Sequence, residues 1–201
     1  MTLNAQIVIV DDDDAVRDSL KVLLEAEDYQ IATYADAKTF LGVSLEQVQC
    51  ILLDVRLPDG DGLDILQQLV DRGIEARTII MTGHGDVPMA VKAMRIGASD
   101  FIEKPFEPDD MLQAIERAVS QFQKDSQTNN ARAQAHERLS RLTPRETEVM
   151  QQLVLGRPNK IIAYELNLSP RTVEVHRARV MEKTEAKSLS DLVRLAITAE
   201  A

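Results

Sequence analysis

Hydrophobic positions in residues 1–120 form short apolar runs separated by amphipathic segments. The runs, which we expect to be strands, are Ile7–Val10, Ile31–Tyr34, Cys50–Leu53, Thr78–Met81 and Asp100–Ile102. Nearly continuous apolar runs of this length are typical of strands buried on both faces of a parallel sheet, and the last run fits this pattern least well.

Between the runs, apolar residues recur at helical spacing. The segments with this spacing are Ala15–Leu24, Leu63–Val70, Val87–Ile96 and Asp109–Val119. Gly73 and Gly97 follow two of them, where helices commonly end. The alternating order predicts an α/β fold over residues 1–122, a (βα)5 doubly wound parallel sheet.

The chain changes character after residue 122. Residues 123–138 are polar and rich in Gln and Asn, so we expect a linker there, with a composition that also permits a helix. Four short helical patterns follow, at Pro144–Leu155, Asn159–Leu166, Pro170–Lys183 and Leu189–Ile197. Thr143 and Glu146 form a capping-box pattern around Pro144, and Ser169 precedes Pro170 in the same way. The pattern predicts an all-α domain of four helices over residues 139–201.

Charge separates the same two halves. Residues 1–120 hold 10 basic and 23 acidic side chains, whereas residues 121–201 hold 13 basic and 10 acidic ones. This asymmetry favours nucleic-acid binding confined to the second half. One cysteine and three histidines argue against a disulfide framework and a Cys- or His-rich metal site. We find no signal-peptide pattern and no membrane-length apolar run, and therefore expect a cytoplasmic protein with no membrane partner.

Polar residues follow the predicted strands of the first half. Asp11 to Asp14 follow the first strand, Asp54 ends the third, Thr82 ends the fourth, and Lys104 follows the fifth. The carboxyl ends of the strands in a doubly wound sheet line one crevice, so these groups should converge. Clustered carboxylates repel unless a cation lies among them, and hard oxygen ligands favour Mg²⁺ together with a phosphate. An Asp carboxylate can itself accept a phosphoryl group, although Asp13 or Asp14 alone would be read as a helix N-cap.

The ordered set strand-DD, LLDVRLPDGDG, MTGHGD and DFIEKPF resembles the receiver domain of two-component response regulators. The resemblance implies that Asp54 is the phosphoryl acceptor, with Thr82 and Lys104 contacting phosphoryl oxygens. It implies a Mg²⁺ site made by Asp11, Asp12, Asp54 and the backbone carbonyl of Arg56. Lys104-Pro105 is commonly cis in this family, and His84 matches no family role, so we expect His84 in a surface loop.

The resemblance also implies a conformational switch. Phe101 occupies the position of the family's switch aromatic, although a plain core role is an equal alternative. Movement of Thr82 and Phe101 would reshape a face that includes Val91, Met94 and Arg95. We expect this face to pair two receivers, so that the phosphorylated chain is a homodimer.

In the second half, Asn159–Leu166 and Pro170–Lys183 form a helix–turn–helix pattern. The pieces LTPRE, NKIIA, LSPRTVEVHR and KSLSDLVRLA together resemble the LuxR/NarL-type DNA-binding domain. We expect the second helix to enter the major groove of double-stranded promoter DNA. The candidates for base contacts are Thr172, Glu174, Val175 and Arg179. The candidates for phosphate contacts are Lys160, Arg171, Arg177 and Lys183, with His176 open between phosphate contact and packing.

The whole chain resembles the FixJ subgroup of response regulators. The resemblance implies a transcription factor, not an enzyme, with a sensor histidine kinase and RNA polymerase as partners and an inverted-repeat DNA site. One alternative is a phosphotransferase of the haloacid dehalogenase type, but the Gly-Thr that should follow its second Asp is missing. Another is a receiver that acts only as an interaction module, which leaves the helix–turn–helix pattern unexplained.

Overall fold

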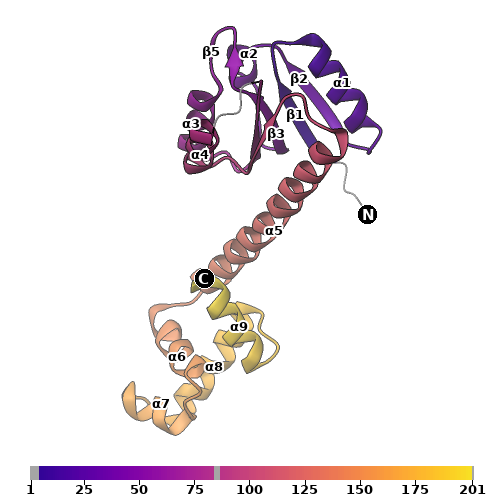
Figure 1. The fold of residues 1–201 in the computed structure, drawn as a ribbon. Coiled ribbons are helices and arrows are strands. Elements are labelled where there is room, and N and C mark those ends of the chain that lie inside the picture. Colours follow the sequence, from indigo (N-terminus) through magenta and orange to yellow (C-terminus); the bar gives the residue numbers. More distant parts are fainter. Residues whose placement is uncertain (1–4, 84–86, 201) are drawn as a thin grey trace. The chain divides into compact units, whose positions relative to one another are not determined.

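The computed structural model describes residues 5–83 and 87–200, so the expectation for His84 lies outside the described residues. The chain has two compact units, residues 1–125 and 126–201 (Figure 1). The predicted fold class is confirmed: the first unit is a five-stranded parallel sheet with helices on both faces, and the second unit is helical.

The sheet has the strand order β2-β1-β3-β6-β7. The strands are β1 (Gln6–Val10), β2 (Gln30–Tyr34), β3 (Val48–Asp54), β6 (Arg77–Thr82) and β7 (Asp100–Glu103). All pairs are parallel, and β3 pairs with β6 in a register that places Asp54 opposite Met81. Since β1 and β3 are adjacent while their connections run to opposite sides, their carboxyl ends form the crevice expected of this topology.

The flanking helices are α1 (Asp14–Glu25), α2 (Ala37–Leu41), α3 (Gly62–Asp71), α4 (Val87–Ile96) and the start of α5 (Pro108–Ser140). Side chains alternate across the sheet, so Val8 and Val10 lie in one core cluster and Ile7 and Ile9 in the other. Cys50 of β3 is fully buried in the cluster that α1 and α5 cover, and burial raises the pKa of its thiol to about 12.

Two short features were not predicted from the sequence. Helix α2 has only five residues, and β4 (Arg56–Leu57) and β5 (Gly60–Asp61) form a small antiparallel ribbon after Asp54. Asp59 ties the two together, because its carboxylate accepts hydrogen bonds from the amides of Ala37 and Lys38 at 2.9 Å each. Both elements are too short to show a hydrophobic period.

The segment expected as a linker is helical. Helix α5 continues without interruption from Pro108 to Ser140, and the boundary between the two units falls within it. The second unit continues with α6 (Pro144–Val154), α7 (Asn159–Glu165), α8 (Pro170–Thr184) and α9 (Leu189–Glu200). Its core cluster includes Val149, Leu153, Ile162, Val173 and Leu192. Among the described residues, no helix has the length and apolarity needed to cross a membrane.

Candidate functional sites

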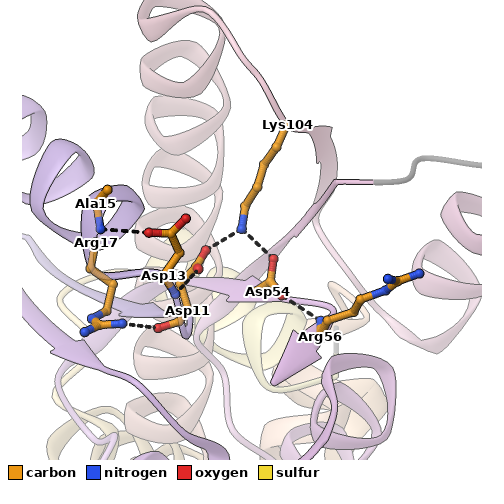
Figure 2. A network of polar contacts seen from close by, with 7 residues as sticks. All are labelled: Asp11, Asp13, Ala15, Arg17, Asp54, Arg56 and Lys104. Carbon is orange, nitrogen blue, oxygen red and sulfur yellow. Dashed lines mark hydrogen bonds and ion pairs between the residues drawn. The ribbon is translucent and has the colours of Figure 1, made fainter. Parts of the chain in front are cut away.

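Three strand ends bring two carboxylates and one ammonium together in the first unit. Asp11 directly follows β1, Asp54 ends β3, and Lys104 directly follows β7. The Lys104 Nζ atom lies 2.5 Å from Asp11 Oδ2 and 2.5 Å from Asp54 Oδ1. Figure 2 shows Lys104 between the two carboxylates, with a dashed line to each. Of the groups expected to converge at the carboxyl edge of the sheet, Asp11, Asp54 and Lys104 therefore do so.

The remaining carboxylate oxygens are held by backbone amides. Asp54 Oδ2 accepts a hydrogen bond from the Arg56 amide at 2.7 Å, and Asp11 Oδ1 accepts one from the Asp13 amide at 3.0 Å (Figure 2). Arg17 of α1 donates to the backbone carbonyl of Asp11 at 2.6 Å. These bonds fix the orientation of both carboxylates, since each has one oxygen on a backbone amide and the other on Lys104.

Burial makes the charges of this site costly. Asp11 is fully buried and Asp54 is 5% exposed. Burial raises the pKa of Asp11, and the hydrogen bonds from Lys104 and from the Asp13 amide offset this only in part. Burial alone would lower the pKa of Lys104, but its bonds to Asp11 and Asp54 outweigh that effect and raise it. One ammonium between two carboxylates leaves an excess negative charge, which favours binding of a further cation.

The donor set for such a cation is mixed. Among the described residues, no three His, Cys, Asp or Glu side chains converge closely enough to form a metal site by themselves. The carboxylates of Asp11 and Asp54 are brought together by Lys104, whereas the Asp12 side chain is exposed beside them in the chain. A site with two or three carboxylate oxygens, a carbonyl and water fits Mg²⁺, which prefers oxygen ligands and keeps several waters.

Thr82 ends β6 next to Asp54 and is 3% exposed. Its hydroxyl donates to Met89 Sδ of α4 at 3.9 Å. Phe101 lies on β7, half-buried, and packs against the core cluster that α3 and α4 cover. The Lys104-Pro105 peptide bond is cis.

Gly62 is a site residue that the sequence analysis missed. A Cβ atom on Gly62 would lie 2.2 Å from the Asp54 carbonyl oxygen and 2.8 Å from Val55 Cα. The Gly62 amide also donates to the Val55 carbonyl at 2.7 Å. Only glycine fits this approach of α3 to the end of β3. The only sequence signal for this role is its place in the run DGDG after Asp54.

The second unit places α8 behind a short turn that follows α7. Ser169 caps α8 by accepting a hydrogen bond from the Thr172 amide at 3.1 Å, and its hydroxyl lies 2.7 Å from the Thr172 hydroxyl. Val173 and Val180 anchor α8 in the core of the unit. The opposite side of α8 is rich in charged side chains, as the helix–turn–helix pattern predicted.

Comparisons with known proteins match both units. Residues 7–116 match the response regulator receiver domain family, and residues 140–196 match the LuxR family of bacterial regulatory proteins. The transcriptional regulatory protein FixJ of Azorhizobium caulinodans is 46% identical over 95% of this chain and 91% of its own. This chain belongs to the FixJ-like response regulators. The FixJ of Bradyrhizobium diazoefficiens is 44% identical over 99% of this chain and 98% of its own.

A solved structure agrees with the assignment. The response regulator StyR is 37% identical to this chain and superposes on it with a TM-score of 0.88. The match covers 97% of this chain and 99% of StyR. The family consists of transcription regulators that have a kinase and DNA as partners, so the alternative of a haloacid dehalogenase-type enzyme is not supported.

In this response regulator the residues expected to contact DNA lie on α7 and α8. Lys160, Arg171, Glu174, Val175 and Arg179 are exposed. Thr172, His176 and Arg177 are half-buried, and Thr172 also takes part in the cap of α8. The predicted dimer residues Val91, Met94 and Arg95 are exposed on α4.

Lys183 has a partner that the sequence analysis did not anticipate. Its ammonium lies 2.6 Å from Oε2 of Glu146, a glutamate of α6 that is 2% exposed. Glu146 also accepts from the Thr143 amide at 2.9 Å, which completes the predicted capping box. The glutamate of the box therefore links the start of α6 to the last turn of α8. The sequence showed the box, but not that a residue 37 positions later shares the same carboxylate.

Proposed function

We infer that Asp54 accepts a phosphoryl group from a sensor histidine kinase and that this event controls DNA binding by the second unit. The observation that carries the proposal is the convergence of Asp11, Asp54 and Lys104 beside Thr82, in a chain that also holds a LuxR-type domain. Each of these residues alone would have a structural explanation. Together they match the requirements of phosphoryl transfer to a carboxylate, which depends on positioning and on balancing negative charge.

In the proposed reaction, an Asp54 carboxylate oxygen attacks the phosphorus of a phosphohistidine. The new O–P bond forms as the N–P bond breaks, and the leaving imidazole takes up a proton. Asp54 is positioned for this attack because the Arg56 amide and Lys104 hold its two oxygens. The Lys104 ammonium then neutralises part of the added negative charge.

Asp11, Asp12, Asp54 and the Arg56 carbonyl would hold Mg²⁺ at this site. When bound, the ion supplies positive charge for phosphoryl oxygens. The support is the donor chemistry together with the excess negative charge that Lys104 leaves unbalanced. Arg17 contributes indirectly, since its bond to the Asp11 carbonyl holds the chain at the end of β1.

The proposed response to phosphorylation is a shift of Thr82 and Phe101. A phosphoryl oxygen on Asp54 offers the Thr82 hydroxyl a stronger acceptor than the Met89 thioether. Movement of Thr82 then leaves space for Phe101 to turn inward. The change reaches α4, where Val91 is 45% exposed and Met94 is 49% exposed. We propose that these residues, with Arg95, form the contact between two phosphorylated receivers.

The dimer is proposed to bind an inverted repeat, with one α8 in each major groove, because the site copies the two-fold symmetry of the protein. Glu174, Val175 and Arg179 are the favoured base contacts, with Thr172 beside the helix start. Lys160, Arg171 and Arg177 are the favoured phosphate contacts, with His176 next to them. We assign Lys183 mainly to its ion pair with Glu146. The DNA-bound dimer is then proposed to recruit RNA polymerase in the cytoplasm.

Substitution of the acceptor tests this function. Asp54→Asn should receive no phosphoryl group from a small acyl phosphodonor with Mg²⁺, and should neither dimerise nor gain affinity for its DNA site. The matched control is Asp64→Asn, which removes one exposed carboxylate from α3. Transfer to Asp54→Asn at the wild-type rate, on the same peptide, contradicts the assignment.

Two mechanisms could link the receiver to DNA binding. Before phosphorylation, the receiver either restrains the second unit or fails to bring two copies of the second unit together as a dimer. Deletion of residues 1–122 separates them: tight DNA binding by the remaining chain supports restraint, and weak binding supports missing dimerisation. Steady turnover of phosphate esters by the full chain would instead support an enzyme.

A further inference from the structure

The end of helix α8 has an unusual residue at its cap. Glu185 follows α8 in the left-handed conformation, with φ 58° and ψ 22°. The Glu185 amide donates to the Glu182 carbonyl and the Ala186 amide to the Met181 carbonyl, both at 3.1 Å, which is the Schellman pattern. Glycine is the usual residue at this position because a side chain strains the backbone there. A glutamate at the negative end of the helix dipole is a further disadvantage.

Two arginines near the end of α5 offset these costs. Arg141 Nη1 donates to Glu185 Oε1 at 2.7 Å, and Arg138 Nη2 lies 3.6 Å from Glu185 Oε2. Arg141 is itself held by Glu137 Oε1 at 2.9 Å. The hydrogen bond from Arg141 and the charge of Arg138 lower the pKa of Glu185, so the carboxylate is ionised at neutral pH. Each carboxylate oxygen thus has its own guanidinium partner.

The last turns of α5 are also packed into the second unit. Ala135 is 1% exposed, although its chain neighbours on both sides are exposed. Leu139 packs against the core cluster of the unit. Ala135 lines a groove of about 480 Å³ together with Thr184, Glu185 and Leu195. Burial of Ala135 and Leu139 therefore places Arg138 beside the end of α8.

The same end of α8 is held on its other side. Lys183, two residues before Glu185, pairs with the buried Glu146 of α6. The three ion pairs connect the end of α8 to α6 through Lys183 and to the end of α5 through Arg138 and Arg141, so the last turn of α8 is fixed between α6 and α5. Together with Val173 and Val180, which pack in the core of the unit, this arrangement fixes the orientation of α8.

We propose that Glu185, held by Arg138 and Arg141, is a positioning residue for DNA binding that makes the last turns of α5 part of the DNA-binding unit. The inference rests on the proposed role of α8 in the major groove. Arg138 lies outside the matched LuxR-family region, which begins at residue 140. The affinity of α8 for its site therefore depends on a segment that the helix–turn–helix pattern does not include.

Substitutions of opposite charge test the proposal. Glu185→Gln removes a negative charge and Arg141→Gln removes a positive one, so a purely electrostatic effect on DNA affinity has opposite signs for the two. The positioning role predicts that both weaken binding, by about fivefold, which corresponds to the upper range for an exposed ion pair. The probe is the duplex that the phosphorylated wild-type chain selects from a random-sequence library, and the full chain is used throughout.

Three further variants complete the test. Glu182→Gln removes a charge one turn from Glu185, and within the described residues Glu182 forms no ion pair, so the DNA affinity of this variant should not fall. Glu185→Gly relieves the left-handed strain and should be at least as resistant to thermal unfolding as the wild type, yet bind DNA as weakly as Glu185→Gln. The double variant of Glu185→Gln with Arg141→Gln should bind no more weakly than either single variant.

The outcomes are distinct. Equal binding by Glu185→Gln and Glu182→Gln, opposite shifts for Glu185→Gln and Arg141→Gln, or wild-type affinity of Glu185→Gly would each overturn the positioning role. Selection of no duplex by the phosphorylated wild-type chain would instead overturn the proposed function, and the positioning role with it.

Discussion

The hydroxyl of Thr82, at the end of β6, donates to the sulfur of Met89 on α4 across 3.9 Å. A thioether is a weak acceptor, so this hydrogen bond is weak. It joins the strand beside Asp54 to the helix that carries Val91 and Met94. A stronger acceptor at Asp54 would therefore change the contact between β6 and α4.

Removal of the Thr82 hydroxyl should separate phosphorylation from its consequence. We expect Thr82→Ala to accept a phosphoryl group at Asp54 but to dimerise at least tenfold less well, since about 1.4 kcal/mol of charge-assisted hydrogen bonding is lost. Thr82→Ser, which keeps the hydroxyl, should dimerise like the wild type. Phosphorylation by mass spectrometry and dimerisation by analytical ultracentrifugation measure the two steps. Full dimerisation of Thr82→Ala would remove Thr82 from the switch.

Lys104→Met should destabilise the first unit and make it more dependent on Mg²⁺. The substitution leaves Asp11 and Asp54 without their ammonium, and we expect a loss of about 3 kcal/mol in the free energy of unfolding. Mg²⁺ should restore more stability to this variant than to the wild type. Urea unfolding with and without Mg²⁺ measures both effects, with Lys92→Met, an exposed lysine of α4, as the control. An unchanged Mg²⁺ response would contradict a cation site beside Asp11.

Gly62→Ala should lower the free energy of unfolding by about 1–3 kcal/mol, because its Cβ would overlap the backbone at Asp54 and Val55. The control is Gly42→Ala, where a Cβ would meet only ordinary contacts at 3.5 Å and φ is −86°. Equal stability of the two variants in urea would show that α3 can move away from β3 at little cost.

The ion pair between Glu146 and Lys183 should make the second unit sensitive to acid. The bond from Lys183, followed by that from the Thr143 amide, lowers the pKa of Glu146 from 4.5 to about 2. Because the folded state prefers the ionised form, this stabilisation is complete above pH 4.5, is lost progressively as the pH falls to about 2, and is absent below that. Hydrogen exchange of the α6 amides, compared between the wild type and Glu146→Gln, should therefore differ at neutral pH and converge towards pH 2. A difference that is constant with pH would contradict the role of the charge.

The salt dependence and the sequence preference of DNA binding distinguish phosphate contacts of the second unit from base contacts. Lys160→Ala should weaken binding to all sequences alike and reduce the salt slope by about one. Glu174→Ala should cost about 1–3 kcal/mol on the preferred site and relax the preference at one position. Binding to a half-site library at several salt concentrations measures both. If Glu174→Ala left every preference intact, its proposed base contact would be excluded.

The sequence predicted the parts of this protein whose signals are local. Apolar runs predict the five parallel strands, and helical spacing predicts the helices between them. The positions of Asp11, Asp54 and Lys104 at strand ends predict that they lie at one edge of the sheet. The cap of α6 was likewise visible in Thr143 and Glu146. These features depend on the order of nearby residues and on one topological rule.

The features that escaped the sequence analysis depend on tertiary partners. In the sequence, Lys183 is one of several basic residues of its helix, and only the fold shows that it forms an ion pair with Glu146. The composition of residues 123–138 predicts a linker and permits a helix, but it does not show that Ala135 is buried, because that burial comes from tertiary packing. Gly62 is required by a close approach between two elements, which no local pattern reveals.

The burial of Cys50 has a practical consequence for spectroscopy. It is the single cysteine of the chain, it lies in the centre of the sheet, and its thiol has a pKa of about 12. A maleimide dye should therefore leave it unmodified as long as the sheet stays closed. Two cysteines introduced at exposed positions, one in each unit, can then carry a donor and an acceptor fluorophore in an otherwise natural sequence. Energy transfer between them would report how the distance between the units responds to a phosphodonor and to DNA.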